Sequence, residues 1–202
     1  MQRSFATAAL VAILVVIASM SATATTVPAG QWAPKFCEAL STFQERLASD
    51  GTKADAVLSG KITNLTQAKT TLTAFMTRAV KDTDTAISTL KHAGTPNAPN
   101  GSKIVAQVMS GFQEARTLFT PAKTQAQHLP TKTLTGFENA TKTLTADLNK
   151  GAQGLNAKFS SIQTLDTTEK IAAALQAEPT CAFVQNSSQQ SQSQSATSAT
   201  AP

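Results

Sequence analysis

The sequence predicts an all-α protein, folded as an antiparallel up-and-down helical bundle of three long helices with a shorter first and a shorter last helix. Apolar residues recur at helical spacing through most of the region 32–184. No stretch of alternating β-branched residues indicates a strand. Clusters of Gly, Pro and Asn interrupt the helical pattern at a few places only, so the connections are short, as in antiparallel bundles.

The first helix is expected over residues 34–48. Pro34 suits a first helical turn, and the dipeptide Asp50-Gly51 is a stop signal. The apolar stripe of this helix consists of Phe36, Leu40, Phe43 and Leu47, with Cys37 at its margin.

The second helix is expected to begin at either Ala54 or Lys61 and to end at Ala93, because Gly94 is a favourable C-cap. The stretch 95–101, which is rich in Pro and Asn, is predicted to be a loop.

The third helix is expected to begin at Ser102 and to end before Pro130. Pro121 lies inside it, but the apolar stripe keeps its phase on both sides, which predicts a kink and not a chain reversal.

The fourth helix, over residues 134–162, has the narrowest apolar stripe. Gly151 and Gly154 lie within it, and they either let another helix approach closely or mark a break.

A short fifth helix should follow, capped by Asp166 or Thr167, with Glu169 available for a capping box. Pro179 is expected to end it just before Cys181.

The N-terminus has the pattern of a cleavable signal peptide. Arg3 precedes an apolar run from Ala8 to Met20, which is too short to span a bilayer core comfortably, and Ala22-Thr23-Ala24 supplies small residues for cleavage. We expect cleavage after Ala24, and the alternative is an uncleaved anchor. No Cys follows the run, which excludes a lipoprotein signal.

The predicted organisation is therefore a signal peptide at 1–24, a short linker at 25–31, one helical domain at 32–184 and a tail at 185–202. The tail is rich in Ser, Gln and Thr and contains no large apolar or charged residue. Such a segment cannot offset the entropy lost on ordering, so we expect it to be disordered.

The formal charge of +5 falls to +4 when Arg3 leaves with the signal peptide. An excess of this size permits an anionic partner such as an envelope polymer. However, the lysines are scattered singly, and there is one Trp and no Tyr to stack on bases. We therefore expect no nucleic-acid partner, and contact with the membrane only through an uncleaved signal segment.

Cys37 and Cys181 stand near the two ends of the predicted domain. An even number of cysteines in an exported chain favours a disulfide between them. Neither lies in a CxxC motif, which argues against a redox function.

Four segments together resemble a loose group of uncharacterised exported or lipid-anchored helical proteins of actinobacteria. They are WAPKFCEAL (32–40), HAGTPNAPNG (92–101), the stretch 115–130 that ends in HLP, and EPTC (178–181). The resemblance implies a secreted or surface-exposed helical protein with a cysteine pair joining its ends. It implies no activity.

No arrangement of residues predicts a catalytic, cofactor-binding or metal site. His92 and His128 are each expected near a helix C-terminus, where an imidazole interacts favourably with the last carbonyls. The carboxylates mostly lie off the apolar stripes, as on solvated helix faces. Thr83 and Thr141 lie within apolar stripes, and their hydroxyls are expected to bond to their own helix backbone.

We therefore expect a non-enzymatic protein, secreted or associated with the cell envelope, that binds a protein or an envelope polymer or has a structural role. No cofactor is expected. Two alternatives are a carrier that holds an apolar small molecule inside the bundle and a hydrolase with an unrecognised site. An internal cavity lined by Leu and Phe would favour the carrier.

Overall fold

The computed structural model describes residues 25–58, 62–160 and 163–181. The described part of the chain is all-helical apart from two very short strands, which confirms the predicted all-α class. The expected signal peptide, the expected tail, Ile162 and Val184 lie outside the described residues.

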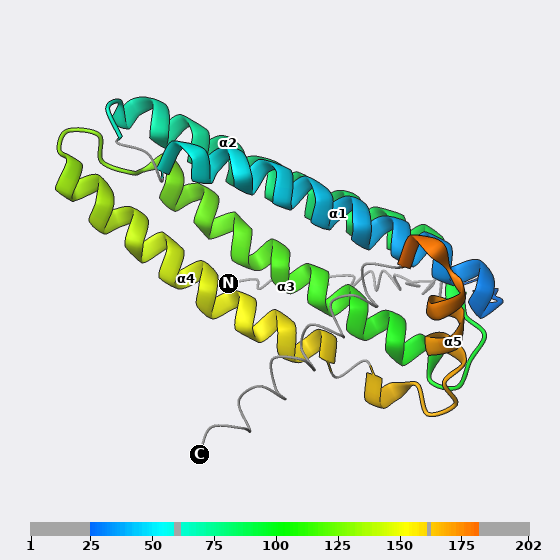
Figure 1. The fold of residues 1–202 in the computed structure, drawn as a ribbon. Helices are drawn as coiled ribbons and strands as arrows, with labels where there is room; N and C mark the ends of the chain where they lie inside the picture. Colours follow the sequence, from blue (N-terminus) through cyan, green and yellow to red (C-terminus); the bar gives the residue numbers. More distant parts are fainter. Residues whose placement is uncertain (1–24, 59–61, 161–162, 182–202) are drawn as a thin grey trace, which may run out of the picture.

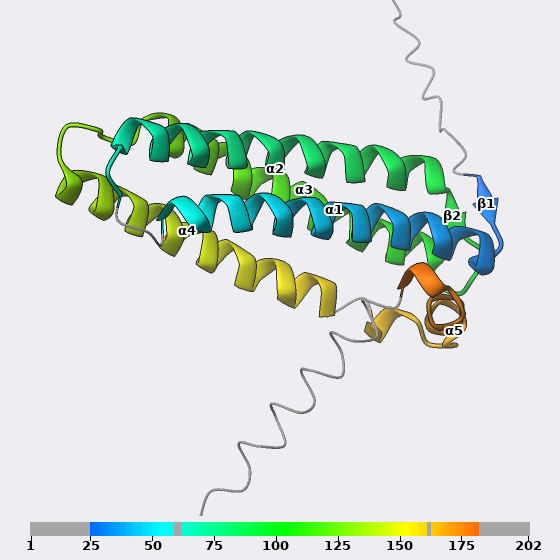
Figure 2. The ribbon, with the colours of Figure 1, turned by 45° about the horizontal axis from the view of Figure 1, so that its top comes forward.

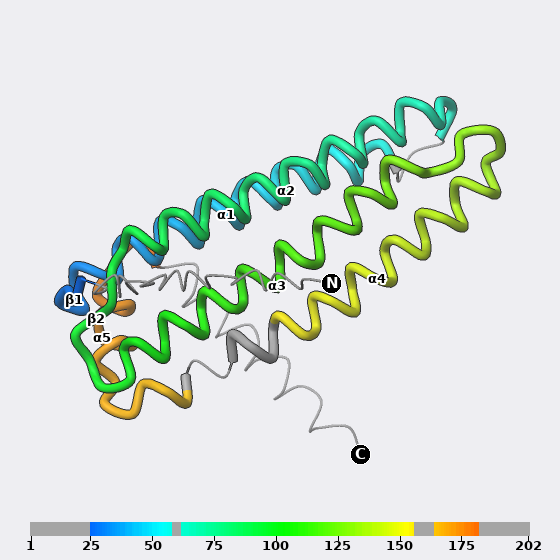
Figure 3. Tube along the Cα trace, turned by 180° about the vertical axis from the view of Figure 1, so that it is seen from behind, coloured from blue at the N-terminus to red at the C-terminus, as the bar shows by residue number. Residues whose placement is uncertain are grey.

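Four long helices follow one another along the chain, and α1 lies against α2, α2 against α3 and α3 against α4 (Figures 1, 2 and 3). A short α5 and the turn after it pack on α1 near its beginning. The elements are β1 (Thr26–Val27), α1 (Ala29–Leu58), α2 (Leu65–Ala93), β2 (Thr95–Pro96), α3 (Gly101–Gln127), α4 (Leu134–Ser160), η1 (Gln163–Leu165), α5 (Lys170–Ala177) and η2 (Pro179–Cys181).

The first helix is not short, and its predicted bounds of 34–48 are wrong. It begins at Ala29, because the Pro28 carbonyl already accepts bonds from the backbone N–H groups of Gln31 and Trp32, at 2.9 and 3.1 Å. It also continues through Asp50-Gly51 to Leu58. The Asp50 side chain is bonded to Lys53 and Arg78 instead of ending the helix.

Residues 25–31, expected to be a linker, instead supply β1 and the first turn of α1. β1 pairs in parallel with β2, with Thr26 opposite Thr95 and Val27 opposite Pro96. Two-residue strands show no alternation, so the sequence predicted only a loop at 95–101. That stretch also contains the first residue of α3.

Gly94 is the C-cap of α2, as predicted, and has a φ of +80°. A Cβ at this position would lie 2.6 Å from the Thr25 carbonyl oxygen. Glycine is therefore required both by the backbone conformation and by the close approach of β1.

α2 begins at Leu65, where the Asn64 side chain accepts a bond from the Gln67 N–H at 2.9 Å. The alternative start at Ala54 is wrong, because Ala54 is a buried residue of α1. The other suggested start, Lys61, lies outside the described residues.

α3 continues through Pro121, so the chain does not reverse there. Pro121 is exposed, and water can therefore bond the carbonyl that loses its helical partner. α4 likewise continues through Gly151 and Gly154, which excludes a break at either glycine.

The predicted capping box at α5 is not formed. Glu169 precedes the helix with a φ of +56°, and its side chain makes no capping bond. The Asp166 carboxylate accepts a bond from the Ala172 N–H at 2.7 Å instead.

Two apolar clusters occupy the two ends of the long helices. The first cluster lies where the beginnings of α1 and α3 meet the end of α2, and α5 packs against it. It includes Trp32, Phe36, Leu90, Ile104, Phe112 and Ile171. The second combines the end of α1, the beginnings of α2 and α4, and the end of α3, and includes Leu72, Met76, Phe119, Phe137 and Leu144. In the first cluster the Trp32 and Phe36 rings stack with their centroids 4.8 Å apart.

Candidate functional site

The predicted disulfide between Cys37 and Cys181 is present. Both residues are fully buried, their Cα atoms are 5.1 Å apart, and 144 positions separate them in the sequence. The bond ties the segment after α5 to the beginning of α1. A buried structural disulfide indicates an oxidising, extracytoplasmic environment.

The two histidines are bonded to their own helices, as the sequence predicted. The Nδ1 of His92 lies 2.7 Å from the Ser88 carbonyl oxygen, and that of His128 lies 2.7 Å from the Thr124 carbonyl oxygen. Since a carbonyl can only accept, each Nδ1 carries a proton and donates it. Both imidazoles are exposed and hold the last turns of α2 and α3.

The two threonines in the apolar stripes also behave as predicted. Thr83 is fully buried and donates to the Ala79 carbonyl at 2.7 Å, and Thr141 donates to the Phe137 carbonyl at 2.8 Å. The proton of each hydroxyl is therefore used within its own helix.

Within residues 25–58, 62–160 and 163–181, no three His, Cys, Asp or Glu side chains lie close enough together to hold a metal ion. In the same ranges no helix combines the length and the apolar character that crossing a bilayer requires.

Charged side chains gather in one open groove of about 510 Å³ between α1 and α2, which we call the α1–α2 charged groove. It is lined by Glu45, Arg46, Ser49, Asp50, Lys53, Arg78, Lys81 and Asp82. Successive lining residues of α1 are one or three positions apart, and the three α2 residues lie within about one turn. Each helix therefore presents its charges along one side.

The two aspartates form the floor of this groove. Asp50 accepts bonds from Lys53 Nζ at 3.0 Å and Arg78 Nε at 2.5 Å, and Asp82 accepts one from Arg46 Nη1 at 3.1 Å. The Asp50 and Asp82 side chains are only 11% and 9% exposed, whereas those of Arg46, Lys53 and Arg78 are 54%, 64% and 44% exposed. The carboxylates are therefore covered, and the cations above them face solvent.

Hydrogen bonding keeps Asp50 ionised despite its burial. The bond from Lys53 lowers the pKa of the Asp50 carboxyl most, burial opposes this, and the bond from Arg78 together with the charges of both cations lowers it further. The net result is a pKa below the ordinary value of 3.8. A fixed negative charge thus holds two cations, one from α1 and one from α2.

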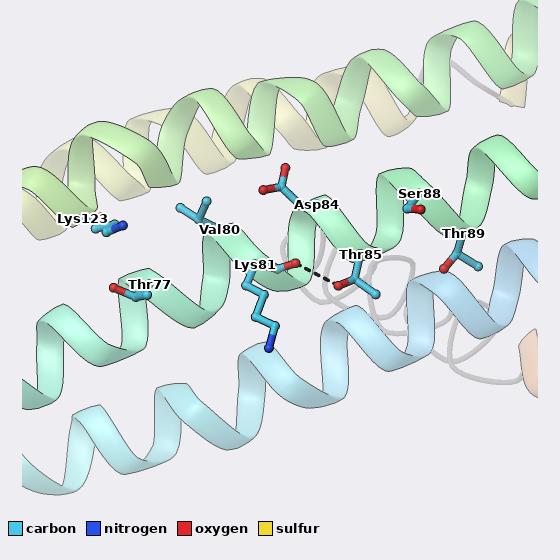
Figure 4. Close-up of a pocket in the computed structure, with 8 residues that line it drawn as sticks. All are labelled: Thr77, Val80, Lys81, Asp84, Thr85, Ser88, Thr89 and Lys123. Carbon is cyan, nitrogen blue, oxygen red and sulfur yellow. Dashed lines mark hydrogen bonds between the residues drawn. The ribbon is translucent and has the colours of Figure 1, made fainter.

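A second open groove, of about 540 Å³, runs along the other side of α2 next to α3 (Figure 4). Its lining is rich in hydroxyls: Thr77, Val80, Lys81, Asp84, Thr85, Ser88, Thr89 and Lys123. Thr77 and Thr85 donate to carbonyls of their own helix, at 2.7 and 3.0 Å. Asp84 is bonded to Arg116 of α3 at 2.6 Å. Neither groove is the enclosed Leu- and Phe-lined cavity that a carrier would need.

Sequence reasoning missed the α1–α2 charged groove, because it took Asp50 as a helix stop and the other carboxylates as solvated residues. The signal that could have found it is the one-sided spacing of the charges on each helix. That signal became interpretable only once α1 was known to continue past Gly51.

The chain was compared with family models, with curated proteins and with solved structures, and none of the three comparisons finds a match.

Proposed function

We propose that this chain is an exported, non-enzymatic binding module of the cell envelope or the extracellular space. In this proposal residues 1–24 are a signal peptide and residues 185–202 a disordered tail. The four long helices form an antiparallel up-and-down bundle that presents α1 and α2 to a partner.

The observation that carries the proposal is the buried Cys37–Cys181 disulfide. Such a bond persists in oxidising compartments and is rare in a reducing cytosol. Two sequence features support export independently, namely the short apolar run after Arg3 and the small residues at 22–24. The resemblance to exported or lipid-anchored actinobacterial proteins agrees with the same compartment.

The state of the titratable side chains supports binding over catalysis. A nucleophile or a general base must have a partner within hydrogen-bonding reach that it can activate. Here the thiols are joined in a disulfide, each imidazole is bonded to a backbone carbonyl, and Asp50 and Asp82 are paired with cations. These groups hold the fold together.

The test of export is expression of the full chain in a bacterial host that carries out secretion, followed by mass spectrometry of each fraction. We expect protein outside the cytoplasm that begins at Thr25 and contains one linked Cys37–Cys181 peptide pair. Two alkylatable thiols in protein recovered from the cytoplasm, with Met1 retained, would contradict the proposal.

The non-enzymatic part is tested with the variant His92→Gln/His128→Gln. Its fold should be unchanged, and it should retain the binding of the wild-type protein. A hydrolytic activity of the wild-type protein that this variant lacks would favour the hydrolase alternative. An apolar ligand that co-purifies with the wild-type protein would favour the carrier.

A further inference from the structure

We propose that the α1–α2 charged groove is a binding site for an anion that carries two or more neighbouring phosphate groups. This inference rests on the proposed binding function and names the chemical class of its ligand. It concerns a groove of the folded protein, so it can be tested separately from export.

Positive and negative charges lie at different depths in the groove. Four cations and three carboxylates line it, but Asp50 and Asp82 are nearly buried beneath the cations. Glu45 is the only exposed acid among the lining residues. A ligand approaching from solvent therefore meets mainly positive charge.

Two of the cations, Arg46 and Arg78, are held in place before any ligand arrives. Arg78 uses its Nε and Arg46 one Nη for the buried aspartates. Each guanidinium has five N–H donors, so most of them stay available on the solvent side. A cation fixed by a buried carboxylate loses little side-chain entropy on binding, which is the advantage of preorganisation.

Lys81 also lines the groove and, within the part of the chain that the structure describes, has no carboxylate within 4 Å of its ammonium. In Figure 4 its side chain extends from α2 toward α1, away from Lys123 on α3. Its ammonium therefore adds an uncompensated positive charge to the α1–α2 charged groove.

The spacing of the cations indicates the size of the ligand. Arg46 and Lys53 are seven residues apart on α1, which corresponds to about 10 Å along the helix axis. Arg78 and Lys81 are three residues apart on α2, or about 4.5 Å. Two or three linked phosphates match a row of this length better than a single phosphate does. Guanidinium and phosphate also match in geometry, because two parallel N–H···O bonds can form.

The experiment measures binding of inorganic tripolyphosphate and orthophosphate to the disulfide-bonded protein by calorimetry at low ionic strength. We expect tripolyphosphate to bind about tenfold more tightly or better, because it contacts both ends of the row at once. A phosphodiester-linked oligomer is a third probe. Binding as tight as that of tripolyphosphate would assign a phosphodiester polymer as the ligand, and weaker binding would assign free polyphosphate.

Two pairs of variants test the location of the site. Lys81→Gln should weaken tripolyphosphate binding about fivefold, which corresponds to one charge contact near 4 Å in water. Lys142→Gln, which removes an exposed lysine of α4, should leave it unchanged. Glu45→Gln should strengthen binding about twofold, and Glu138→Gln on α4 should not. All four residues are exposed, so the variants are expected to fold.

Absence of tripolyphosphate binding would overturn the inference. So would equal weakening by Lys81→Gln and Lys142→Gln, since the anion would then respond only to net charge. If the protein binds tripolyphosphate in the groove but is never exported, the proposed function fails and the site remains. If it is exported but does not bind, the site fails alone.

Discussion

At the scale of single residues, Asp50 shows how a nearly buried carboxylate can remain charged. Burial alone would favour the neutral acid, but bonds from Lys53 and Arg78 outweigh it and lower the pKa of the carboxyl. The same bonds explain why Asp50-Gly51 does not end the helix. A side chain that would otherwise cap a turn is held by a neighbouring helix.

This arrangement predicts a pH dependence of stability. The folded-state pKa of Asp50 lies below 3.8, so its contribution is complete above the unfolded-state pKa and is lost as the pH falls through the lower folded-state value. Asp50→Asn should therefore lower the free energy of unfolding by about 1–2 kcal/mol at neutral pH, and the difference from wild type should shrink in acid. Urea unfolding at pH values from about 7 down to about 2 measures both effects.

Asp147→Asn is the matched control, because Asp147 is an exposed carboxylate of α4 that accepts a hydrogen bond from the neutral Gln125 side chain. Its stability should follow that of wild type at every pH. If the Asp50→Asn protein remains less stable than wild type by the same free energy in acid, the bonds that it lacks do not depend on ionisation of the Asp50 carboxyl.

At the scale of elements, the packing of α4 on α3 depends on small residues. A Cβ at Gly151 would overlap the Leu118 side chain of α3, so this glycine permits a close approach. A Cβ at Gly154 would meet only the carboxyl end of the Glu114 side chain, at 3.3 Å. The sequence left open whether these glycines allow close packing or break the helix, and the structure favours close packing at Gly151.

The two glycines should respond differently to alanine. Gly154→Ala should raise the free energy of unfolding by up to about 1 kcal/mol, because alanine favours helix and the new Cβ would meet only the terminal Oε1 of Glu114, at 3.3 Å, which needs to move only slightly. Gly151→Ala should lower it by about 1–3 kcal/mol, since Leu118 is displaced. Thermal unfolding followed by circular dichroism compares them.

Leu118→Ala tests the cause, because it should relieve the overlap. Gly151→Ala should lower the free energy of unfolding by less in the Leu118→Ala background than in the wild-type background. Equal costs in both backgrounds would mean that Leu118 does not oppose a Cβ at position 151.

At the scale of the whole molecule, the disulfide ties the last described segment of the chain to the beginning of α1. α5 and the turn after it contact α1, where Ile171 and Cys181 complete the first apolar cluster. An eight-residue helix is marginal by itself, so its position depends on this packing and on the covalent bond.

Removing the bond should therefore destabilise the whole molecule and release one end of it. Closing a loop of 144 residues contributes at most about 5 kcal/mol in the chain-entropy model, and Cys37→Ala/Cys181→Ala should lose a large part of this. Chemical denaturation measures the loss. The backbone amides of α5 should exchange hydrogen faster than in the wild-type protein. The relative protection of α2 and α3 should not change.

The unreduced wild-type protein and the wild-type protein treated with a reductant under native conditions serve as controls. Reduced wild type should resemble the double variant. Full protection of α5 in both would show that apolar packing holds the helix without the disulfide.

The sequence by itself determined the helical class, the approximate places where α2, α3 and α4 end, the C-cap at Gly94 and the cysteine pair. These features follow from local causes: apolar periodicity, Gly and Pro at helix ends, and an even number of cysteines. The hydrogen bonds from the side chains of Thr83, Thr141, His92 and His128 to backbone carbonyls are local in the same way, since each carbonyl lies four residues earlier in the chain.

Only the tertiary structure decided the full length of α1, the pairing of β1 with β2 and the α1–α2 charged groove. Each depends on residues far apart in the sequence. The Asp50 side chain pairs with Arg78 of α2, 28 residues away, and Thr26 pairs with Thr95 of β2. A local sequence pattern indicates which conformation a segment favours by itself. The packing of the helices decides which distant residues it meets, and those contacts can override the local preference.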